Sequence, residues 1–388
     1  MDSRILAFSV AEYRDRTRRV QDRMAELGLD ALLCHSFDST CYLTGLQSVM
    51  GPAKYFMTVV PAEGDPFLLG QDFELHNARF TSWVEDLTAH PVFEDPVEAS
   101  RVLLAGRGLA GKRLGVEMKR LCMNPLQFAS LRQALPEAQL VDASSLVPSI
   151  RMLKSAAELD YMRRACRISS RAMEAAVGAV AEGRTDNEVA AVAVEVCFRE
   201  GGEFFCLEPI VSLGDRSSVP HSSFAGNRAR SGDLCFIEIG ANIQRYSGPL
   251  IRTVALGEPD AEVSRAGAEA AASLNAVIAA MRPGVTAQAV AFEGRKAWEW
   301  TASHPEYVWN GAYAYSVGLG FPSDWCWCDA WLFIHEREEA VLQPGMVFHC
   351  TNNIRRPGVF GLGISETVAI TDSGAEVLTS FDRRLLVR

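Results

Sequence analysis

Two residues that can move protons lie close together in a stretch that has the pattern of a β-hairpin. Glu238 sits inside the apolar run 234–239, which follows a Ser-Gly-Asp turn and predicts a buried strand. A carboxylate is costly in such a strand unless it is paired or used in chemistry. His221 lies shortly before this strand, so the two side chains suggest a carboxylate base or nucleophile with an imidazole proton shuttle. The alternative is a structural glutamate on an edge strand and a histidine in a loop.

A helix–helix–hairpin pattern occurs twice in the second half of the chain. Residues 179–193 resemble residues 280–294, and the segments GDLCFIEIGANI and RTVAL resemble GMVFHCTNNI and ETVAI. Two such copies predict a domain with a pseudo-twofold repeat. The second strand of the first hairpin is predicted at 251–256, after a turn around Gly248 and Pro249. The site is expected where the two hairpins meet.

The repeat places residues of the two hairpins in corresponding positions. Glu238 corresponds to Thr351, and Arg252 corresponds to Glu366. Glu238, Thr351 and Glu366 are therefore expected to converge, with Glu366 pairing with a cationic substrate nitrogen or orienting water. The direction of Glu366 stays open, because neighbouring strand residues face opposite ways. Arg252 is expected to be structural, pairing with an acid of the opposite hairpin.

The first part of the chain alternates between helix and strand patterns. A helix is predicted over 9–28, with Ser9 and Glu12 spaced as a capping box, and a second helix over about 125–134. Short strands are predicted at 31–34, 55–60, 66–69, 114–117 and 140–142. This alternation predicts an α/β domain that ends near Pro148.

The order of several motifs resembles the creatinase/aminopeptidase P/prolidase superfamily. The frame G…PH…GD…I-x-x-G…Y…RT is joined by YLTG at 42–45, IRMLKSAAELDYMRRA at 150–165, QPGMVFHCTNN at 343–353 and GISETVAITDSGAEVLT at 363–379. The resemblance implies an α+β protein. Its creatinase-like N-terminal α/β domain would span residues 1–148, and its pita-bread catalytic domain would span 149–388.

The resemblance also identifies where the metallopeptidases of this superfamily hold two metal ions with two Asp, one His and two Glu. The corresponding positions here are Glu238, Pro249, Tyr315, Thr351 and Ser365. Four of these five residues are poor donors for Mn, Co or Zn, which need carboxylate or imidazole groups. No metal site and no cofactor are therefore expected.

The C-terminal half resembles the metal-free ectoine hydrolase branch, through YSVGLGFPSDW, GMVFHC, GISET and RYSGPLIRTV. One departure is Ser247, where that branch is expected to have His after Arg-Tyr. The expected activity is hydrolysis of a non-peptide C–N bond in a cyclic amidine, lactam or guanidino compound other than ectoine. A lyase or cyclase on the same scaffold and a non-catalytic binding module are the alternatives.

Several further side chains are candidates for holding the substrate. Tyr246 and Tyr315 could position it or stabilise developing charge through their hydroxyls. Asp324 and Trp325 belong to a Gly/Pro/aromatic stretch that resembles a pocket wall more than a strand. His349 alternates with Phe348 on the strand leading to Thr351, so it faces either the site or the opposite side.

The loop 46–54 is punctuated by Gly and Pro and carries one charge, Lys54. In the metal-free relatives the matching loop reaches across a dimer, so the resemblance implies a homodimer in which Lys54 or Met50 contacts the partner's substrate. A solvated surface loop is the alternative.

Composition excludes several classes of partner. The chain of 388 residues has a formal net charge of −10, which argues against nucleic acid, because binding phosphates needs clustered Lys and Arg. No run of 18 apolar residues is present, so no membrane is expected as a partner. No secretory signal is visible, and the ten cysteines lack framework spacing, which predicts a cytoplasmic protein with reduced thiols and a small-molecule substrate.

Overall fold

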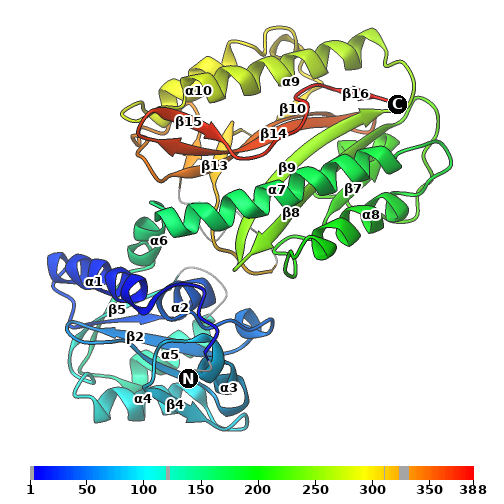
Figure 1. The fold of residues 1–388 in the computed structure, drawn as a ribbon. Helices are drawn as coiled ribbons and strands as arrows, with labels where there is room; N and C mark the ends of the chain where they lie inside the picture. The colour runs from blue at the N-terminus through cyan, green and yellow to red at the C-terminus, as the bar shows by residue number, and fades with distance from the viewer. Residues whose placement is uncertain (1–3, 119–122, 310, 323–331) are drawn as a thin grey trace. The chain divides into compact units, whose positions relative to one another are not determined.

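The structure, a computed structural model, describes residues 4–118, 123–309, 311–322 and 332–388. Two compact units make up the chain, Met1–Arg151 and Met152–Arg388 (Figure 1). The boundary expected from the sequence, between 148 and 149, lies a few residues before this division. None of the helices in the described ranges is long and apolar enough to cross a membrane.

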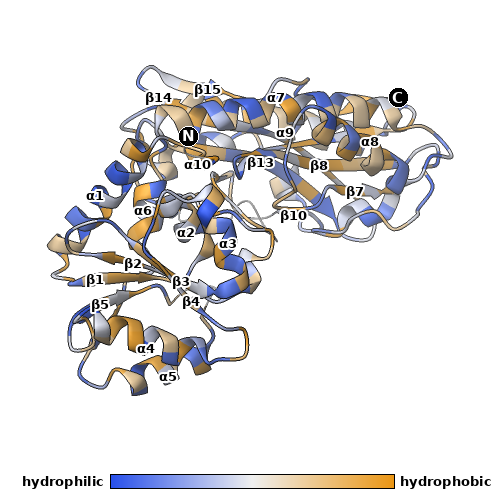
Figure 2. Cartoon of the chain, turned by 60° about the horizontal axis from the view of Figure 1, so that its bottom comes forward, coloured by the Kyte–Doolittle hydropathy of each residue, from blue (hydrophilic) through white to orange (hydrophobic). Residues whose placement is uncertain are grey.

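The N-terminal unit is built on a six-stranded sheet with the order β4-β3-β2-β1-β5-β6. Its strands are β1 (Ala31–Cys34), β2 (Phe56–Pro61), β3 (Phe67–Gln71), β4 (Leu87–His90), β5 (Arg113–Val116) and β6 (Gln139–Asp142). Its helices are α1 (Val10–Glu26), α2 (Phe37–Thr44), the 3-10 helix η1 (Gly51–Ala53), α3 (Asp72–Thr81), α4 (Pro96–Gly106), α5 (Pro125–Ala134) and α6 (Leu146–Arg151). Helices α4 and α5 cover one face of the sheet (Figure 2), where apolar side chains such as Leu69 and Leu104 form the core.

Only half of the capping box predicted for α1 forms. The Ser9 hydroxyl accepts the Glu12 amide at 3.2 Å, as expected. The Glu12 carboxylate instead binds the guanidinium of Arg16 at 2.8 Å, because this buried cation needs a partner more than an exposed amide does.

The C-terminal unit contains two sheets, each covered by a pair of helices. A four-stranded sheet has the order β16-β9-β8-β7, and a six-stranded sheet has the order β12-β11-β13-β14-β15 with β10 also pairing with β13. The strands are β7 (Ile210–Leu213), β8 (Leu234–Ile243), β9 (Tyr246–Ala255), β10 (Val308–Trp309), β11 (Ala314–Ser316), β12 (Phe333–Ile334), β13 (Val347–Arg356), β14 (Phe360–Thr371), β15 (Gly374–Val377) and β16 (Leu386–Val387). The helices are α7 (Ala156–Ala179), α8 (Asp186–Arg199), η2 (Gly214–Ser218), α9 (Ala261–Ala280), α10 (Ala287–Arg295) and η3 (Thr301–Ser303).

The two sheets and their helices form the predicted pseudo-twofold repeat. Apolar residues of α7 and α8 pack on β7, β8 and β9, and those of α9 and α10 pack on β11, β13 and β14 (Figure 1). Complete capping boxes, Ser155 with Glu158 and Thr185 with Glu188, begin α7 and α8. The pita-bread arrangement is therefore confirmed.

The first hairpin turns earlier than the sequence suggested. Gln244 and Arg245 form its two-residue turn, with left-handed φ angles of 49° and 68°. The carboxylate of Glu203 accepts both of their amides, at 2.8 and 3.1 Å, which stabilises this backbone. Gly248 lies inside β9, where a Cβ would lie 2.6 Å from the Cys166 amide nitrogen. The prediction of a turn around Gly248 and Pro249 was wrong, because close packing on α7, not a turn, requires this glycine.

The two hairpins meet along β9 and β14. The Ile251 amide donates to Ser365 Oγ at 2.6 Å, and Thr367 Oγ1 donates to the Pro249 carbonyl at 2.7 Å. Since side chains alternate along a strand, Glu238 of β8 shares its face with Phe236, whereas Ile237 and Ile239 face the helices. This inner face of the two hairpins carries the candidate site.

Candidate active site

A cavity of about 150 Å³ opens on the inner face of the hairpins. The described residues that line it are Pro220, His221, Glu238, Val308, Trp309, Tyr315, Thr351, Asn353 and Arg355. Three of the predicted site residues, His221, Glu238 and Tyr315, therefore lie on one cavity. They come from three separate elements: the loop after η2, strand β8 and strand β11.

Glu238 supplies the acid of this cavity. Its residue is 8% exposed, and in the sheet it pairs with Ile210 of β7 and Ile251 of β9. The apolar side chains of Phe236, Ile210 and Ile251 pack together beside it. Its charge acts on Arg355 across the cavity, raising the pKa of that guanidinium, although burial has the larger and opposite effect. The cavity therefore contains one carboxylate, that of Glu238, and one cationic guanidinium, that of Arg355.

His221 lies at the rim of the cavity with an exposed side chain. Its backbone has a φ of 56°, a left-handed conformation that a non-glycine residue adopts at a cost of about 1 kcal/mol. Such costs are concentrated at functional sites. The cost of this conformation indicates that His221 is kept for a functional role and not for packing.

Tyr315 is anchored behind the cavity by a chain of hydrogen bonds. Its Oη lies 2.6 Å from His349 Nδ1, and His349 Nε2 lies 2.7 Å from Ser365 Oγ. His349 is fully buried, and burial together with the charge of Arg252 lowers its pKa to about 3. The imidazole is therefore neutral near pH 7 and carries one N–H.

The direction of the chain is an assignment, because both ring nitrogens of His349 can donate or accept and a hydroxyl can accept two hydrogen bonds. The Ile251 amide can only donate, so Ser365 Oγ accepts from it. Among the described residues, His349 Nε2 is the hydrogen-bond acceptor that lies within reach of the Ser365 hydroxyl proton. We assign Nε2 as the acceptor, so that Nδ1–H donates to Tyr315 Oη and the tyrosine keeps its own proton. His349 acts here as a positioning residue for Tyr315, not as a substrate ligand as predicted.

Glu366 does not reach the cavity. In the β13–β14 pairing Ser365 stands opposite Thr351, so Glu366 faces the other side of the sheet. Its carboxylate accepts from Arg252 Nη2 at 2.6 Å and from Arg383 Nε at 3.1 Å, and also from the Thr379 hydroxyl. The catalytic role predicted for Glu366 is therefore corrected to a structural one. The predicted pairing of Arg252 with an acid of the opposite hairpin is confirmed.

Tyr246 is also structural. Its hydroxyl donates to the Glu158 carboxylate at 2.6 Å, and its ring stacks on Tyr161 with centroids 6.1 Å apart. These contacts join β9 to the start of α7, so the predicted substrate contact is corrected.

The structure tests none of the other three predicted residues. Lys54 follows η1 in the N-terminal unit, and its contact with a partner's substrate stays a prediction. Asp324 and Trp325 lie outside the described residues.

Sequence reasoning missed two polar residues of the cavity wall, Asn353 and Arg355. Both lie on β13 and alternate with Thr351, so a period of two extended from Thr351 would have placed them on the same face. Trp309 was also missed, because β10 is only two residues long and has no periodicity to read.

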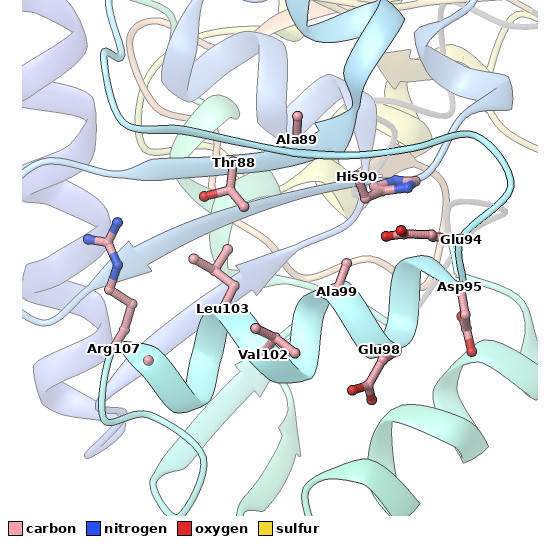
Figure 3. A pocket seen from close by; sticks show the side chains of 11 residues that line it. Thr88, Ala89, His90, Glu94, Asp95, Glu98, Ala99, Val102, Leu103 and Arg107 are labelled. Carbon is pink, nitrogen blue, oxygen red and sulfur yellow. The ribbon is translucent and has the colours of Figure 1, made fainter.

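A larger cavity, of about 540 Å³, lies in the N-terminal unit between β4 and α4 (Figure 3). Three of its charged groups are engaged locally. Asp95 caps α4 by accepting the Val97 amide, Glu98 binds Arg101, and Arg107 binds Asp86. Its lining also includes an imidazole and a carboxylate, His90 and Glu94, but none of the site residues predicted from the sequence.

The donors on the inner face do not fit a pair of metal ions. Of the five positions that match the metallopeptidase ligands, Glu238 alone carries a carboxylate, and Pro249 has no side-chain donor at all. In the ranges that the structure describes, no group of three or more His, Cys, Asp or Glu side chains could hold a metal ion. Serine, threonine and tyrosine hydroxyls bind Mn, Co or Zn poorly without such partners.

Two helix–helix–hairpin copies around a carboxylate-bearing cavity define a protein of the pita-bread fold. The chain belongs to metallopeptidase family M24, whose sequence pattern matches residues 160–372. The Creatinase/Prolidase N-terminal domain pattern matches residues 16–153.

The names of the relatives within the family refer to the hydrolysis of different kinds of bond. The chain is 28% identical to the ectoine hydrolase of Halomonas elongata, over 99% of each chain. It is 29% identical to the Xaa-Pro dipeptidase of Pyrococcus furiosus, over 62% of this chain and 67% of that protein. Among solved structures, dipeptidase PepE from Mycobacterium ulcerans aligns with a TM-score of 0.84 at 25% identity, over 98% of this chain and 99% of that one. Family membership thus identifies a hydrolase fold and leaves the scissile bond to the site itself.

Proposed function

We propose that this protein is a metal-independent hydrolase that cleaves a non-peptide C–N bond in a small nitrogenous metabolite. A cyclic amidine, a lactam or a guanidino compound is the substrate class. The observation that carries the proposal is that Glu238 shares a cavity of about 150 Å³ with His221 and Tyr315. A space of this size suits a small metabolite, and the surrounding hydroxyls replace the donors that a metallopeptidase needs. Similarity over the full length is comparable for an ectoine hydrolase and for a dipeptidase, so the assignment rests on the residues of the cavity.

The proposed reaction uses the side chains of the cavity alone. Glu238 takes a proton from water, and the water oxygen attacks the carbon of the C–N bond. The electron pair of the C–N bond leaves with nitrogen, to which His221 delivers a proton, so that water is added across the bond. In a variant of this route the Glu238 carboxylate attacks the carbon first, the C–N bond breaks and His221 protonates the leaving nitrogen; water then hydrolyses the resulting mixed anhydride, or its nitrogen analogue, and restores Glu238.

Tyr315 would stabilise the charge that develops during attack. Tyr315 lines the cavity, and with His349 assigned as a donor to its oxygen, its O–H is the group that would donate to the reacting atom. The neutral imidazole of His349 also avoids adding a further charge to those of Glu238 and Arg355.

The proposal is tested by presenting the purified protein with cyclic amidines, lactams and guanidino acids and detecting hydrolysis by mass spectrometry. Glu238→Gln is expected to abolish turnover with an unchanged unfolding transition. Glu208→Gln, at an exposed position, is the matched control and should keep wild-type turnover. Turnover that survives in Glu238→Gln would remove Glu238 from the mechanism.

Heavy-oxygen water separates hydrolysis from the lyase and cyclase alternatives. Hydrolysis places one labelled oxygen in the product, whereas elimination or cyclisation leaves the product unlabelled. In a single turnover, label that first enters the Glu238 carboxylate would identify the nucleophilic route over the base route.

A further inference from the structure

Three arginines line a groove on the solvent side of α7. The groove contains a cavity of about 280 Å³, and Arg164, Arg167 and Arg171 of α7 belong to its wall. Ile168 and Ile243 form its floor, since each is 7% exposed and belongs to the core that α7 and α8 share with the first hairpin. Because side chains alternate along β8, this helix-covered side of the sheet is opposite the side that carries the candidate active site. The groove is therefore a separate site.

The positive charge of this groove is only partly neutralised by the protein. Arg171 binds Glu200, which also lines the cavity, at 2.5 Å. In the part of the chain that the structure describes, neither Arg164 nor Arg167 pairs with a carboxylate. Like charges three or four residues apart destabilise a helix. The chain has a formal net charge of −10, so two uncompensated cations in one groove are not a general property of its surface. Their clustering indicates a site for an anion.

Two of the three guanidinium groups are held in place by their neighbours. Arg164 lies over the ring of Tyr161, with its Cζ 5.5 Å from the ring centroid, and Arg171 is held by its ion pair with Glu200. Arg167 stands between them. Since a helix rises about 1.5 Å per residue, the three arginines span roughly 10 Å along α7. Groups that are already positioned lose less conformational freedom when a ligand binds.

The charges of the groove fit a phosphate group better than a carboxylate. A phosphate monoester carries a charge of about −1.5 to −2 at pH 7, which matches the two uncompensated guanidinium groups of Arg164 and Arg167. A carboxylate would neutralise only one of them. Guanidinium groups also bind phosphate oxygens through paired hydrogen bonds. The cavity volume leaves room for a small organic group beside the phosphate.

We propose that this groove binds the phosphate group of a small phosphorylated molecule through Arg164, Arg167 and Arg171. Glu200 limits the affinity, because it occupies Arg171 and adds a negative charge to the wall. The inference does not depend on the proposed hydrolase activity, since none of the residues of the candidate active site lines this groove.

The test measures binding by calorimetry to the full-length protein at low ionic strength, where exposed charges are least screened. The probes are inorganic phosphate, butyl phosphate and pentanoate. Butyl phosphate and pentanoate have the same apolar chain and differ in the charged group. Both phosphates are expected to bind about tenfold more tightly than pentanoate, the lower end of the range for a hydrogen bond to a charged group, because the groove is open to solvent.

Three variants test the assignment of the residues. Arg167→Met is expected to weaken phosphate binding about tenfold, whereas Glu200→Gln should strengthen it, because Arg171 is released from its ion pair. Arg167 and Glu200 are exposed, so both variants should keep the wild-type unfolding transition. Arg163→Met is the matched control. It removes the same charge from the same helix, but Arg163 binds Glu376 at 2.7 Å and does not line the cavity. Phosphate affinity should stay within about twofold of wild type in this control.

The inference is overturned if phosphate does not bind, or if pentanoate binds as tightly as butyl phosphate. It is also overturned if Arg163→Met weakens binding as much as Arg167→Met, which would indicate a general attraction to the helix. Glu238→Gln locates the site independently of turnover. Phosphate binding that persists in this variant supports the groove on α7, and binding that is lost with Glu238 but not with Arg167 would place the phosphate in the hairpin cavity instead.

Discussion

His349 makes the stability of the C-terminal unit depend on pH in a calculable way. Burial and the charge of Arg252 lower its pKa to about 3, whereas an unfolded histidine titrates near 6.5. A lowered pKa in the folded state means that unfolding takes up a proton at acidic pH. The contribution of His349 to the free energy of unfolding is therefore complete above pH 6.5 and is lost progressively as the pH falls towards 3.

The size of the effect at pH 5 follows from the difference in pKa. Each pH unit below 6.5 costs about 1.4 kcal/mol, so the free energy of unfolding should fall by about 2 kcal/mol between pH 7 and pH 5. His349→Asn keeps a donor for Tyr315 and cannot titrate. It should be less stable than wild type at pH 7 and should lack this share of the acid sensitivity.

Urea unfolding of both proteins at pH 7 and pH 5 measures the difference directly. Other titrating groups, such as the buried His35, contribute equally to both proteins and cancel. An NMR titration of His349 reports the protonation state of its ring. The ring should stay neutral, with its proton on Nδ1, down to about pH 4. Equal acid sensitivity in both proteins, or a ring that titrates near 6.5, would refute the neutral chain from Ser365 to Tyr315.

Three other substitutions probe the remaining assignments. Tyr315→Phe should lower kcat about a hundredfold with little change in KM, as expected for the loss of one donor to developing charge; an equal rise in KM would instead indicate a ground-state contact. His221→Ala should flatten the basic limb of the pH–rate profile, because His221 acts as the proton donor and loses that role when it deprotonates; an unchanged profile would exclude proton shuttling. Glu366→Gln leaves the buried Arg252 with a neutral partner and should cost about 3–5 kcal/mol of stability. The exposed pair of Glu376 with Arg163 is its control, since Glu376→Gln should cost less than about 1 kcal/mol by the same urea assay.

The features that could be predicted from the sequence are those set by local patterns. The apolar run around Glu238 defines a buried strand, and Ser155 and Thr185 with their glutamates define helix starts. The repeat of this pattern gives the pita-bread arrangement, and it also gives the partner of Arg252, because equivalent residues face each other across a pseudo-twofold axis.

The features that could not be predicted depend on non-local contacts or on a one-residue register. Glu366 and Ser365 are neighbours, and the pairing of Ser365 with Thr351 alone decides which of them faces the cavity. Tyr246 donates to Glu158, which is 88 residues away in the sequence. No local pattern indicates that contact. The same limit applies to Gly248, whose need for a small residue arises from the backbone of α7.

The central claim is that side chains alone, led by Glu238, carry the chemistry of this cavity. Elemental analysis of the purified protein by mass spectrometry tests that claim most directly. The account predicts Mn, Co, Zn and Fe far below one ion per chain, together with full activity after treatment with a chelator. One or two bound ions per chain that are lost together with activity on chelation would contradict it.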